Sequence, residues 1–429
     1  MSRNTIVSVY AQEVYTDRVH PGVEAIVKTE DGSEGRAVCT SGVSVGTHEA
    51  PFCLDGGPRF GGMGVQSAVN NVNSIISPAL VGQDASNQFL IDNTILGLAH
   101  DAKAKLGGNA IAAVSAAALK AGAESLDIPL YRHIGGIGAV CLPVPGVMIA
   151  GGGNRYGGAI NNAGGKPSYS IMLHGFKRFA DASYAGWEIQ QKWLEVIRAR
   201  FPYAQANDKG GVDIPPGIIA SDEELWEMMN ETIIKAGYEG CCGLQADIAT
   251  DSYYDKTDCK YYGLFSKEPK YVDDLFKIYE KMVEHYNFIV LEDPFNEDDY
   301  DNTALLTNML GIQIVGDDLF TTNPLRVREG ISKGAANTVL LKVNQIGTIT
   351  EAMEMVALAY RYGYGVMPNS SRGEGAAIAD YAVGINAATV RERACYPVGN
   401  RFMEIERELG SRAVFLGIEG FKGHRFLRQ

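Results

Sequence analysis

The sequence lacks several features that mark particular classes of protein. Its seven cysteines are scattered and form no CxxC pair, so neither a zinc site nor a disulfide framework is predicted. No run reaches the roughly 18 apolar residues of a membrane span, and the first residues do not place a basic stretch before an apolar one. We therefore expect a soluble, cytoplasmic protein with reduced thiols.

Basic charge is also in short supply. The chain has 38 Lys and Arg against 51 Asp and Glu, which gives a net charge of −13. This balance argues against nucleic acid or an anionic membrane as the main partner. The glycine-rich segment GGGNRYGG matches neither the phosphate-binding loop of P-loop proteins nor the dinucleotide-binding pattern, so it does not indicate a nucleotide site.

The first third of the chain has the patterns of a small mixed domain. Residues 5–39 alternate apolar and polar side chains, with DGSEG as a turn between two strand-like runs. From about residue 63 to 127 apolar residues recur at helical spacing. We predict an N-terminal α+β capping domain over residues 1–138, ending before a glycine-rich boundary segment.

The rest of the chain alternates short apolar strands with amphipathic helices. Strands that are apolar on both faces are typical of a parallel sheet covered by helices. Polar residues follow many of these strands, and barrel active sites lie at the carboxyl ends of strands. We therefore predict an α/β fold with a TIM-type barrel over residues 139–429.

Four of these strands end in residues that suit one chemistry. The runs GLQAD, NFIVLED, IQIVGDD and NTVLLKVNQ place Asp247, Glu292, Asp317 and Lys342 at strand ends, and the last three are evenly spaced. Converging carboxylates repel one another unless a cation binds them, and hard oxygen ligands favour Mg²⁺, with Mn²⁺ as an alternative. A buried lysine beside them can serve as a general base. The alternatives are helix-capping aspartates and a lysine that reaches the surface.

Longer motifs give a family resemblance. VLEDPFNEDD, GIQIVGDDLFTTNP, LLKVNQIGTITEA and MEIERELG resemble the enolases, the phosphopyruvate hydratases of glycolysis. The resemblance implies a barrel of ββαα(βα)6 order, magnesium and usually a homodimer or higher homo-oligomer. It also implies that Asp247, Glu292 and Asp317 bind the metal, that Lys342 abstracts the proton, and that Ser44 on the loop TSGVSVGTHEA reaches the metal.

Other positions of the family's site are occupied by different residues here. Arg155 stands where the family has a histidine, while Ser168 and Lys209 stand at two glutamate positions. The phosphate-binding segment reads VMPNSSRGE, and Arg391 replaces a lysine. The predicted substrate-binding residues are therefore Ser44, Arg155, Ser168, Asn369, Ser370, Ser371, Arg372 and Arg391.

These replacements lead to one main hypothesis and several rivals. The main hypothesis is a Mg²⁺-dependent dehydratase-type lyase that forms a metal-stabilised enolate from a small polyanionic carboxylic acid. Lys342 is its base and Lys209 its partner across the substrate, unless Lys209 acts only through its charge or is a solvated loop residue. The rivals are an ordinary phosphopyruvate hydratase, a racemase or cycloisomerase that uses the two lysines, and a non-catalytic scaffold.

Overall fold

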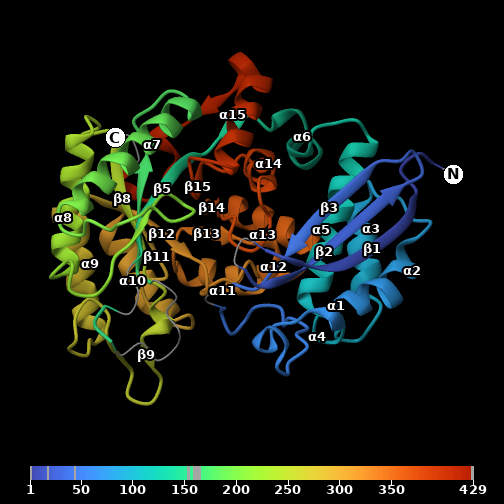
Figure 1. The fold of residues 1–429 in the computed structure, drawn as a ribbon, viewed down its shortest axis with the longest axis horizontal. Coiled ribbons are helices and arrows are strands. Elements are labelled where there is room, and N and C mark those ends of the chain that lie inside the picture. Colours follow the sequence, from blue (N-terminus) through green and yellow to red (C-terminus); the bar gives the residue numbers. More distant parts are fainter. Residues whose placement is uncertain (1, 17–18, 43–44, 152–154, 158–165, 427–429) are drawn as a thin grey trace.

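A computed structural model describes residues 2–16, 19–42, 45–151, 155–157 and 166–426. Figure 1 shows two packed parts, a smaller one built from the first third of the chain (blue to cyan) and a larger one built from the rest (green to red). Most of the candidate catalytic residues lie in the larger part, and its strands bring them together.

The smaller part contains an antiparallel meander of β1 (Ile6–Tyr15), β2 (Pro21–Thr29) and β3 (Glu34–Cys39), as predicted. One face of this sheet packs on α5 (Gly108–Ser125), a helix whose side chains are almost all buried. A Cβ atom on Gly35 would lie 2.0 Å from the Ala117 carbonyl oxygen. The sheet and the helix thus approach so closely that only glycine fits at this position.

The predicted helical region of residues 63–127 is confirmed. Besides α5, the smaller part contains the following helices: α1 (Gln66–Asn71), α2 (Ser77–Leu80), α3 (Gln88–Leu96), α4 (Ala102–Leu106) and α6 (Leu130–Gly135). The side chains of Asn87 and Asp101 accept backbone N–H groups at the starts of α3 and α4, where helices leave such donors unpaired. Residue 138 lies between α6 and β4 (Cys141–Leu142), and the domain boundary placed there remains a prediction.

The larger part is built on one curved sheet. Its neighbouring strands are, in order, β14 (Gly365–Pro368), β13 (Thr338–Leu341), β12 (Gln313–Gly316), β11 (Phe288–Glu292), β8 (Cys242–Asp247), β6 (Ser168–Leu173), β5 (Val144–Gly151) and β15 (Thr389–Arg393), with β7 (Val212–Asp213) paired to β5. Only β6 runs antiparallel to its neighbours in this list. The two strands at the ends of this list, β14 and β15, contact each other, so the sheet curls round as a barrel.

Helices cover the outside of this barrel. They are α7 (Phe179–Arg198), α8 (Asp222–Lys235), α9 (Val272–Tyr286), α10 (Tyr300–Leu310), α11 (Pro324–Lys333), α13 (Ile349–Arg361), α14 (Ala377–Gly384) and α15 (Val398–Leu409). The short, buried α12 (Val343–Ile346) instead follows β13 and contacts α5 of the smaller part. Short pairs join β9 (Tyr254–Asp255) to β10 (Lys260–Tyr261) and β4 to β16 (Val414–Phe415). The element order is therefore ββαα followed by repeated βα units, as predicted. In the part of the chain that is described, no helix combines the length and the apolar character that crossing a membrane requires.

The two parts meet where α3 and α5 pack against α12 and α13. A buried carboxylate, Asp92 on α3, lies in this interface and accepts hydrogen bonds from Ser115 Oγ at 2.6 Å, Thr350 N at 2.9 Å and Thr350 Oγ1 at 2.7 Å. Because Thr350 lies in the first turn of α13, the Asp92 carboxylate satisfies an unpaired helix-end donor across the interface. This contact fixes how the smaller part is seated on the barrel.

Replacing Asp92 with alanine should therefore lower the free energy of unfolding by about 3 kcal/mol, because it leaves several buried donors without an acceptor. Urea unfolding followed by circular dichroism would measure the change. The matched control is Asp101→Ala, which removes an exposed helix cap in the same part and should cost only about 1 kcal/mol. Equal losses in the two variants would contradict the role given to the interface carboxylate.

Candidate active site

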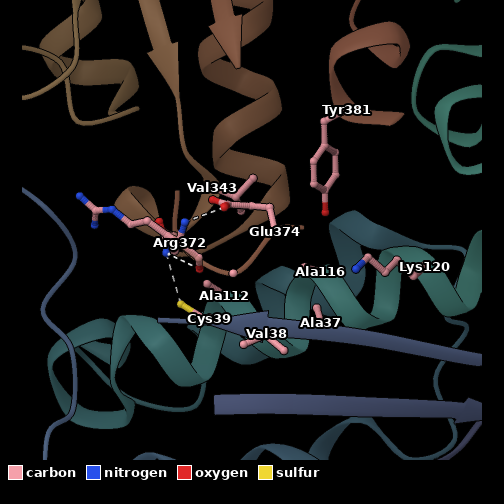
Figure 2. Close-up of a pocket in the computed structure, with 12 residues that line it drawn as sticks. Ala37, Val38, Cys39, Ala112, Ala116, Lys120, Val343, Arg372, Glu374 and Tyr381 are labelled. Carbon is pink, nitrogen blue, oxygen red and sulfur yellow. Dashed lines mark hydrogen bonds between the residues drawn. The ribbon is translucent and has the colours of Figure 1, made fainter. Parts of the chain in front are cut away.

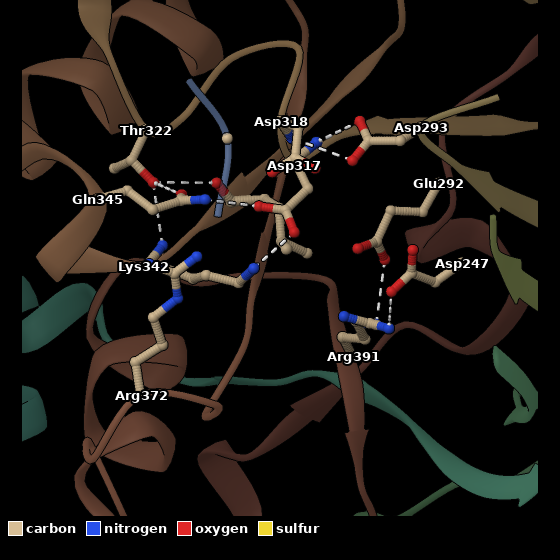
Figure 3. Close-up of polar contacts among 12 residues, drawn as sticks. Asp247, Glu292, Asp293, Asp317, Asp318, Thr322, Lys342, Gln345, Arg372 and Arg391 are labelled. Carbon is tan, nitrogen blue, oxygen red and sulfur yellow. Dashed lines mark hydrogen bonds and ion pairs between the residues drawn. The ribbon is translucent and has the colours of Figure 1, made fainter. Parts of the chain in front are cut away.

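Carboxylates gather at the carboxyl ends of neighbouring barrel strands (Figure 3). Asp247 is the last residue of β8 and Glu292 the last residue of β11, and the parallel register places them opposite each other. Asp317 directly follows β12. All three are buried, with Glu292 completely enclosed. The sequence prediction that these residues meet at one end of the barrel agrees with this arrangement.

A fourth acid, Asp293, belongs to the same cluster. Single carboxylate oxygens of Glu292, Asp293 and Asp317 lie within 4.8 Å of one another. Asp293 also accepts hydrogen bonds from the backbone N–H groups of Asp317, at 2.9 Å, and Asp318, at 3.0 Å. Asp293 thus shapes the turn after β12 that aims Asp317. Its place directly after Glu292 in the motif LEDP was the only sequence signal for it.

Asp247 has a different environment from the other predicted metal ligands. Lys166 and Arg391 both form ion pairs with its carboxylate. Arg391 Nε also lies 3.1 Å from Glu292 Oε2, so the guanidinium bridges the two acids, as Figure 3 shows. The grouping within 4.8 Å contains Asp293 where the sequence prediction had Asp247, and the metal role of Asp247 stays a prediction.

Lys342 lies directly after β13 and faces Asp317. Its Nζ donates to Asp317 Oδ2 at 2.5 Å, and its backbone N–H donates to Thr322 Oγ1 at 3.0 Å. Gln345 Nε2 donates to the other Asp317 oxygen at 2.7 Å. The side chain of Lys342 is 6% exposed, so the snorkelling alternative does not describe it. A buried lysine held by its own strand and by an acid has the placement that a general base needs.

Burial and charge act in opposite directions on the site's acids. Burial raises the pKa of Glu292, although Arg391 opposes this effect. Burial also acts to raise the pKa of Asp317, but the Lys342 ammonium outweighs it, with Arg372 and Arg391, and the pKa falls to about 2. Burial and the neighbouring Arg391 lower the pKa of Lys166 to about 7. The site is thus a compact set of mutually compensating charges.

The donor set fits a divalent metal ion. Both carboxylate oxygens of Glu292 are buried and lack a hydrogen-bond partner among the described residues, since the contact with Arg391 has only ion-pair geometry. A buried carboxylate that accepts no hydrogen bond is costly even beside an arginine, and a bound cation would reduce that cost. Carboxylate oxygens are also the ligands that Mg²⁺ and Mn²⁺ favour. Glu292 and Asp317, with Asp293 or Asp247, are therefore the residues that could hold the ion.

Arg372 is tied to the smaller part of the molecule. Its guanidinium makes a bidentate ion pair with Glu49, and both side chains are almost fully buried. Figure 2 shows the hollow between the two parts, lined by Cys39, Lys120 and Glu374 among others, with the Arg372 side chain pointing out of it. Figure 3 shows the same side chain reaching towards Lys342. The substrate-binding role predicted for Arg372 stays a prediction, and the structure adds a structural role.

Arg155 is held by a neighbouring acid. Its Nη2 donates to Asp222 Oδ1 at 2.7 Å, and the hydroxyls of Tyr156 and Tyr169 also donate to this carboxylate, at 2.8 and 2.7 Å. Asp222 begins α8, so the arginine links the glycine-rich segment to a barrel helix. One nitrogen of Arg155, Nη1, has no hydrogen-bond partner among the described residues. Its predicted contact with substrate remains untested.

The remaining predicted residues lie around the rim. Ser168 Oγ accepts from Arg391 Nη2 at 3.3 Å, while Lys209 Nζ lies 3.8 Å from Glu392 Oε2. Asn369, Ser370 and Ser371 follow β14, and Ser370 Oγ donates to the Gly375 carbonyl at 3.2 Å. Ser44 lies outside the described residues. Sequence reasoning missed Lys166, Asp293, Gln345 and Glu392, because none of them aligns with a catalytic position of the family's motifs.

The segment after Ser44 is held against the barrel by a polar latch, residues Thr47, His48, Glu297 and Asp298. Thr47 Oγ1 donates to Glu297 Oε1 at 2.5 Å, and His48 Nε2 lies 2.8 Å from Asp298 Oδ1. Asp251 supports the latch by accepting the Glu297 N–H at 2.9 Å. Burial, followed by the charges of Glu297 and Asp298, raises the pKa of Asp251 to about 7.

Comparison with known proteins gives a consistent result along the chain. Residues 139–424 match the family model for the enolase C-terminal TIM barrel domain, and residues 6–134 match the model for the enolase N-terminal domain. A protein named Enolase from Methanopyrus kandleri is 41% identical over 424 residues, which cover 96% of this chain and 97% of that protein. A protein named Enolase from Bifidobacterium animalis subsp. lactis is 37% identical over 435 residues, covering 98% and 99%.

The raised pKa of Asp251 predicts a pH dependence of stability. The unfolded aspartate has a pKa of about 3.9, so the folded chain keeps a proton that the unfolded chain loses between about pH 4 and 7. Protonated Asp251 therefore contributes to the free energy of unfolding. This contribution is at most about 4 kcal/mol, is complete below pH 4 and is lost as the pH rises through 7. Unfolding titrations of wild type and Asp251→Asn should diverge across this range. Parallel curves would contradict the prediction.

Proposed function

Because the chain belongs to the enolase family, and so to the hydro-lyases of the enolase superfamily, we propose that it removes water from a small carboxylic acid carrying a second anionic group. The observation that carries this proposal is the buried contact of 2.5 Å between Lys342 Nζ and Asp317 Oδ2, within a group of acids at the strand ends. A base beside a cation-binding site is the arrangement needed to remove a weakly acidic C–H proton.

Lys342 is the proposed base. Its neutral amine would take the proton from the carbon next to the substrate carboxylate, and its position would be set by β13 and by the Thr322 hydroxyl. Asp317 would orient the amine and then stabilise the ammonium that forms. Burial excludes water that would otherwise compete for the proton. Holding the base and the substrate in one geometry is itself a large part of such a rate enhancement.

The acids would hold the metal ion. Glu292 and Asp317, with Asp247 as the third predicted ligand, offer only oxygen atoms, and the oxygens of Glu292, which accept no hydrogen bond among the described residues, support this assignment. When bound, Mg²⁺ would supply the positive charge that favours a carboxylate becoming more negative as the proton leaves. Lys166 and Arg391 would give up part of their contact with Asp247 to the ion.

The cations around the acids would bind the substrate's negative groups. Arg372 and Arg391 have buried side chains and Lys166 a partly buried one, and all three contact acids of the site or of its loop. Guanidinium groups suit carboxylate and phosphate because they donate two parallel hydrogen bonds. A substrate with two anionic groups is therefore the best match to a site with this many cations.

Two substrates follow from different observations. The two relatives, both named Enolase and covered almost completely, favour 2-phosphoglycerate, which would be dehydrated to phosphoenolpyruvate. This substrate is the first candidate. The residues Ser168, Lys209 and Ser371, which replace two acids and an arginine of the family pattern, favour a polyanionic acid with its second anion placed differently. The same Lys342 chemistry would serve both.

A cytoplasmic homodimer is proposed on the family resemblance alone.

The first test concerns the base. In deuterated water, wild-type protein with Mg²⁺ should exchange the α-proton of 2-phosphoglycerate and form phosphoenolpyruvate, both visible by NMR. Lys342→Ala should lower the exchange rate by at least about 100-fold, because no other group takes over a positioned base. Lys281→Ala, which removes an exposed lysine on α9, is the control and should leave both rates unchanged. Undiminished exchange in Lys342→Ala would refute the assignment of the base.

The second test concerns the metal. Calorimetric titration with Mg²⁺ should show saturable binding by wild type, and a concentration of 100 times Kd should raise the free energy of unfolding by about 2.7 kcal/mol. Glu292→Gln should lose most of this binding, since the neutral amide is a weaker ligand. Binding of equal strength in the two proteins would place the ion elsewhere, and no binding by wild type would favour a non-catalytic scaffold.

A further inference from the structure

The end of strand β15 has an unusual backbone. Glu392 and Arg393 both have positive φ angles, of 55° and 82°, and the pairing of β15 with β5 shifts register between Val390 and Arg393. Residues other than glycine rarely adopt this conformation, and two in succession cost free energy. Such bulges turn a side chain in a direction that a regular strand does not allow.

The bulge lets two consecutive side chains serve the same end of the barrel. In a regular strand successive side chains point to opposite faces. Here Arg391 contacts Asp247 and Glu292, while Glu392 Oε1 accepts from Ser170 Oγ at 3.1 Å and Glu392 Oε2 lies 3.8 Å from Lys209 Nζ. Glu392 therefore brings a carboxylate to the rim of the same charged site.

Glu392 is a buried acid that pairs with a lysine. Burial acts to raise its pKa, but Lys209 first, then Arg391, Arg393 and Lys166, lower it to about 2. The residue is 6% exposed, whereas the Lys209 side chain is 32% exposed. A small hollow lies beside the pair, lined by Gly146, Met148, Gln190, Lys209, Glu392 and Tyr396. The carboxylate is thus enclosed, whereas the lysine that pairs with it is partly exposed to solvent.

We propose that Glu392 is a positioning residue that holds the Lys209 ammonium at the active site, where Lys209 gives a proton to the departing hydroxyl group. The inference rests on the proposed dehydration. Lys342 takes the α-proton, the electron pair of the C–H bond forms the new C=C bond, and the C–O bond breaks as the hydroxyl leaves. Lys209 transfers its proton to that oxygen, so water is released, and solvent later restores both lysines.

The small side chains around the pair support this role. Positions 168 and 209, which the family resemblance assigns to glutamates, carry serine and lysine here. Ser168 and Ser170 leave room on β6, and they contact Arg391 and Glu392 from there. The carboxylate at this place thus comes from Glu392 on β15 and not from β6, and Lys209 is the group that carries the proton. The strained backbone at Glu392 and Arg393 accompanies this placement of the Glu392 carboxylate.

The test separates proton removal from loss of the hydroxyl. Glu392→Gln keeps the shape of the side chain and the contact with Ser170 but removes the charge. With 2-phosphoglycerate it should lower dehydration at least about tenfold while α-proton exchange stays within about threefold of wild type. Lys209→Met should show the same split more strongly. Lys209→Arg should keep the pairing but still fail in dehydration, because a guanidinium does not release its proton.

Equal losses of exchange and dehydration in Glu392→Gln, or full dehydration by Lys209→Arg, would overturn the inference. The pairing is also measurable without turnover, from the unfolding equilibria of Glu392→Gln, Lys209→Met and the double variant. If the two side chains interact, the unfolding equilibrium constant of the double variant should differ at least about twofold from the value expected by multiplying the effects of the two single substitutions. Absence of coupling would overturn the inference even if wild type is active. Coupling in a protein that neither exchanges nor dehydrates would refute the proposed function and leave the pairing supported.

Discussion

The structure depends on holding several negatively charged carboxylates close together in the buried interior of the barrel. Asp247, Glu292 and Asp317 are each at most 5% exposed, and Asp293 lies beside them. Carboxylates in such a setting repel one another and lose the solvation of water, so a fold can hold them only with compensating cations. Lys166, Lys342 and Arg391 supply that compensation from different segments of the barrel. A protein without use for a cation site would gain stability from losing these acids, which is why we regard them as functional.

The same constraint explains why the smaller part belongs to the site. Arg372 compensates the acids from the loop after β14, but its ion pair is made with Glu49 of the smaller part. Gln345 donates to Asp317 at 2.7 Å and lies 3.4 Å from Glu49, so the two parts are joined through one polar network. Movement of the segment around Glu49 would therefore displace Arg372 and Gln345 relative to Asp317. Seating of the smaller part and chemistry at the strand ends are physically coupled.

Much of the site was predictable because it is local. Parallel strands end at one side of a barrel, so acids and a lysine directly after apolar runs had to converge there. The predicted fold, with its ββαα start, followed from long motifs and from the alternation of strands and helices. Arg155 was harder, because its partner Asp222 begins a helix far along the chain. Arg372 was harder still, since Glu49 lies in the other part of the molecule, and Glu392 depends on a bulge that no periodicity indicates.

The relatives named Enolase shift the balance between the two substrates without changing the chemistry. The central claim is that the buried acids exist to hold a divalent cation beside Lys342. Crystals soaked in Mn²⁺ and measured at the manganese absorption edge would test it most directly. The account predicts an anomalous peak in contact with Glu292 and Asp317, with Arg391 drawn back from Glu292. A site without manganese, in which Lys166 and Arg391 keep their ion pairs with Asp247, would contradict it.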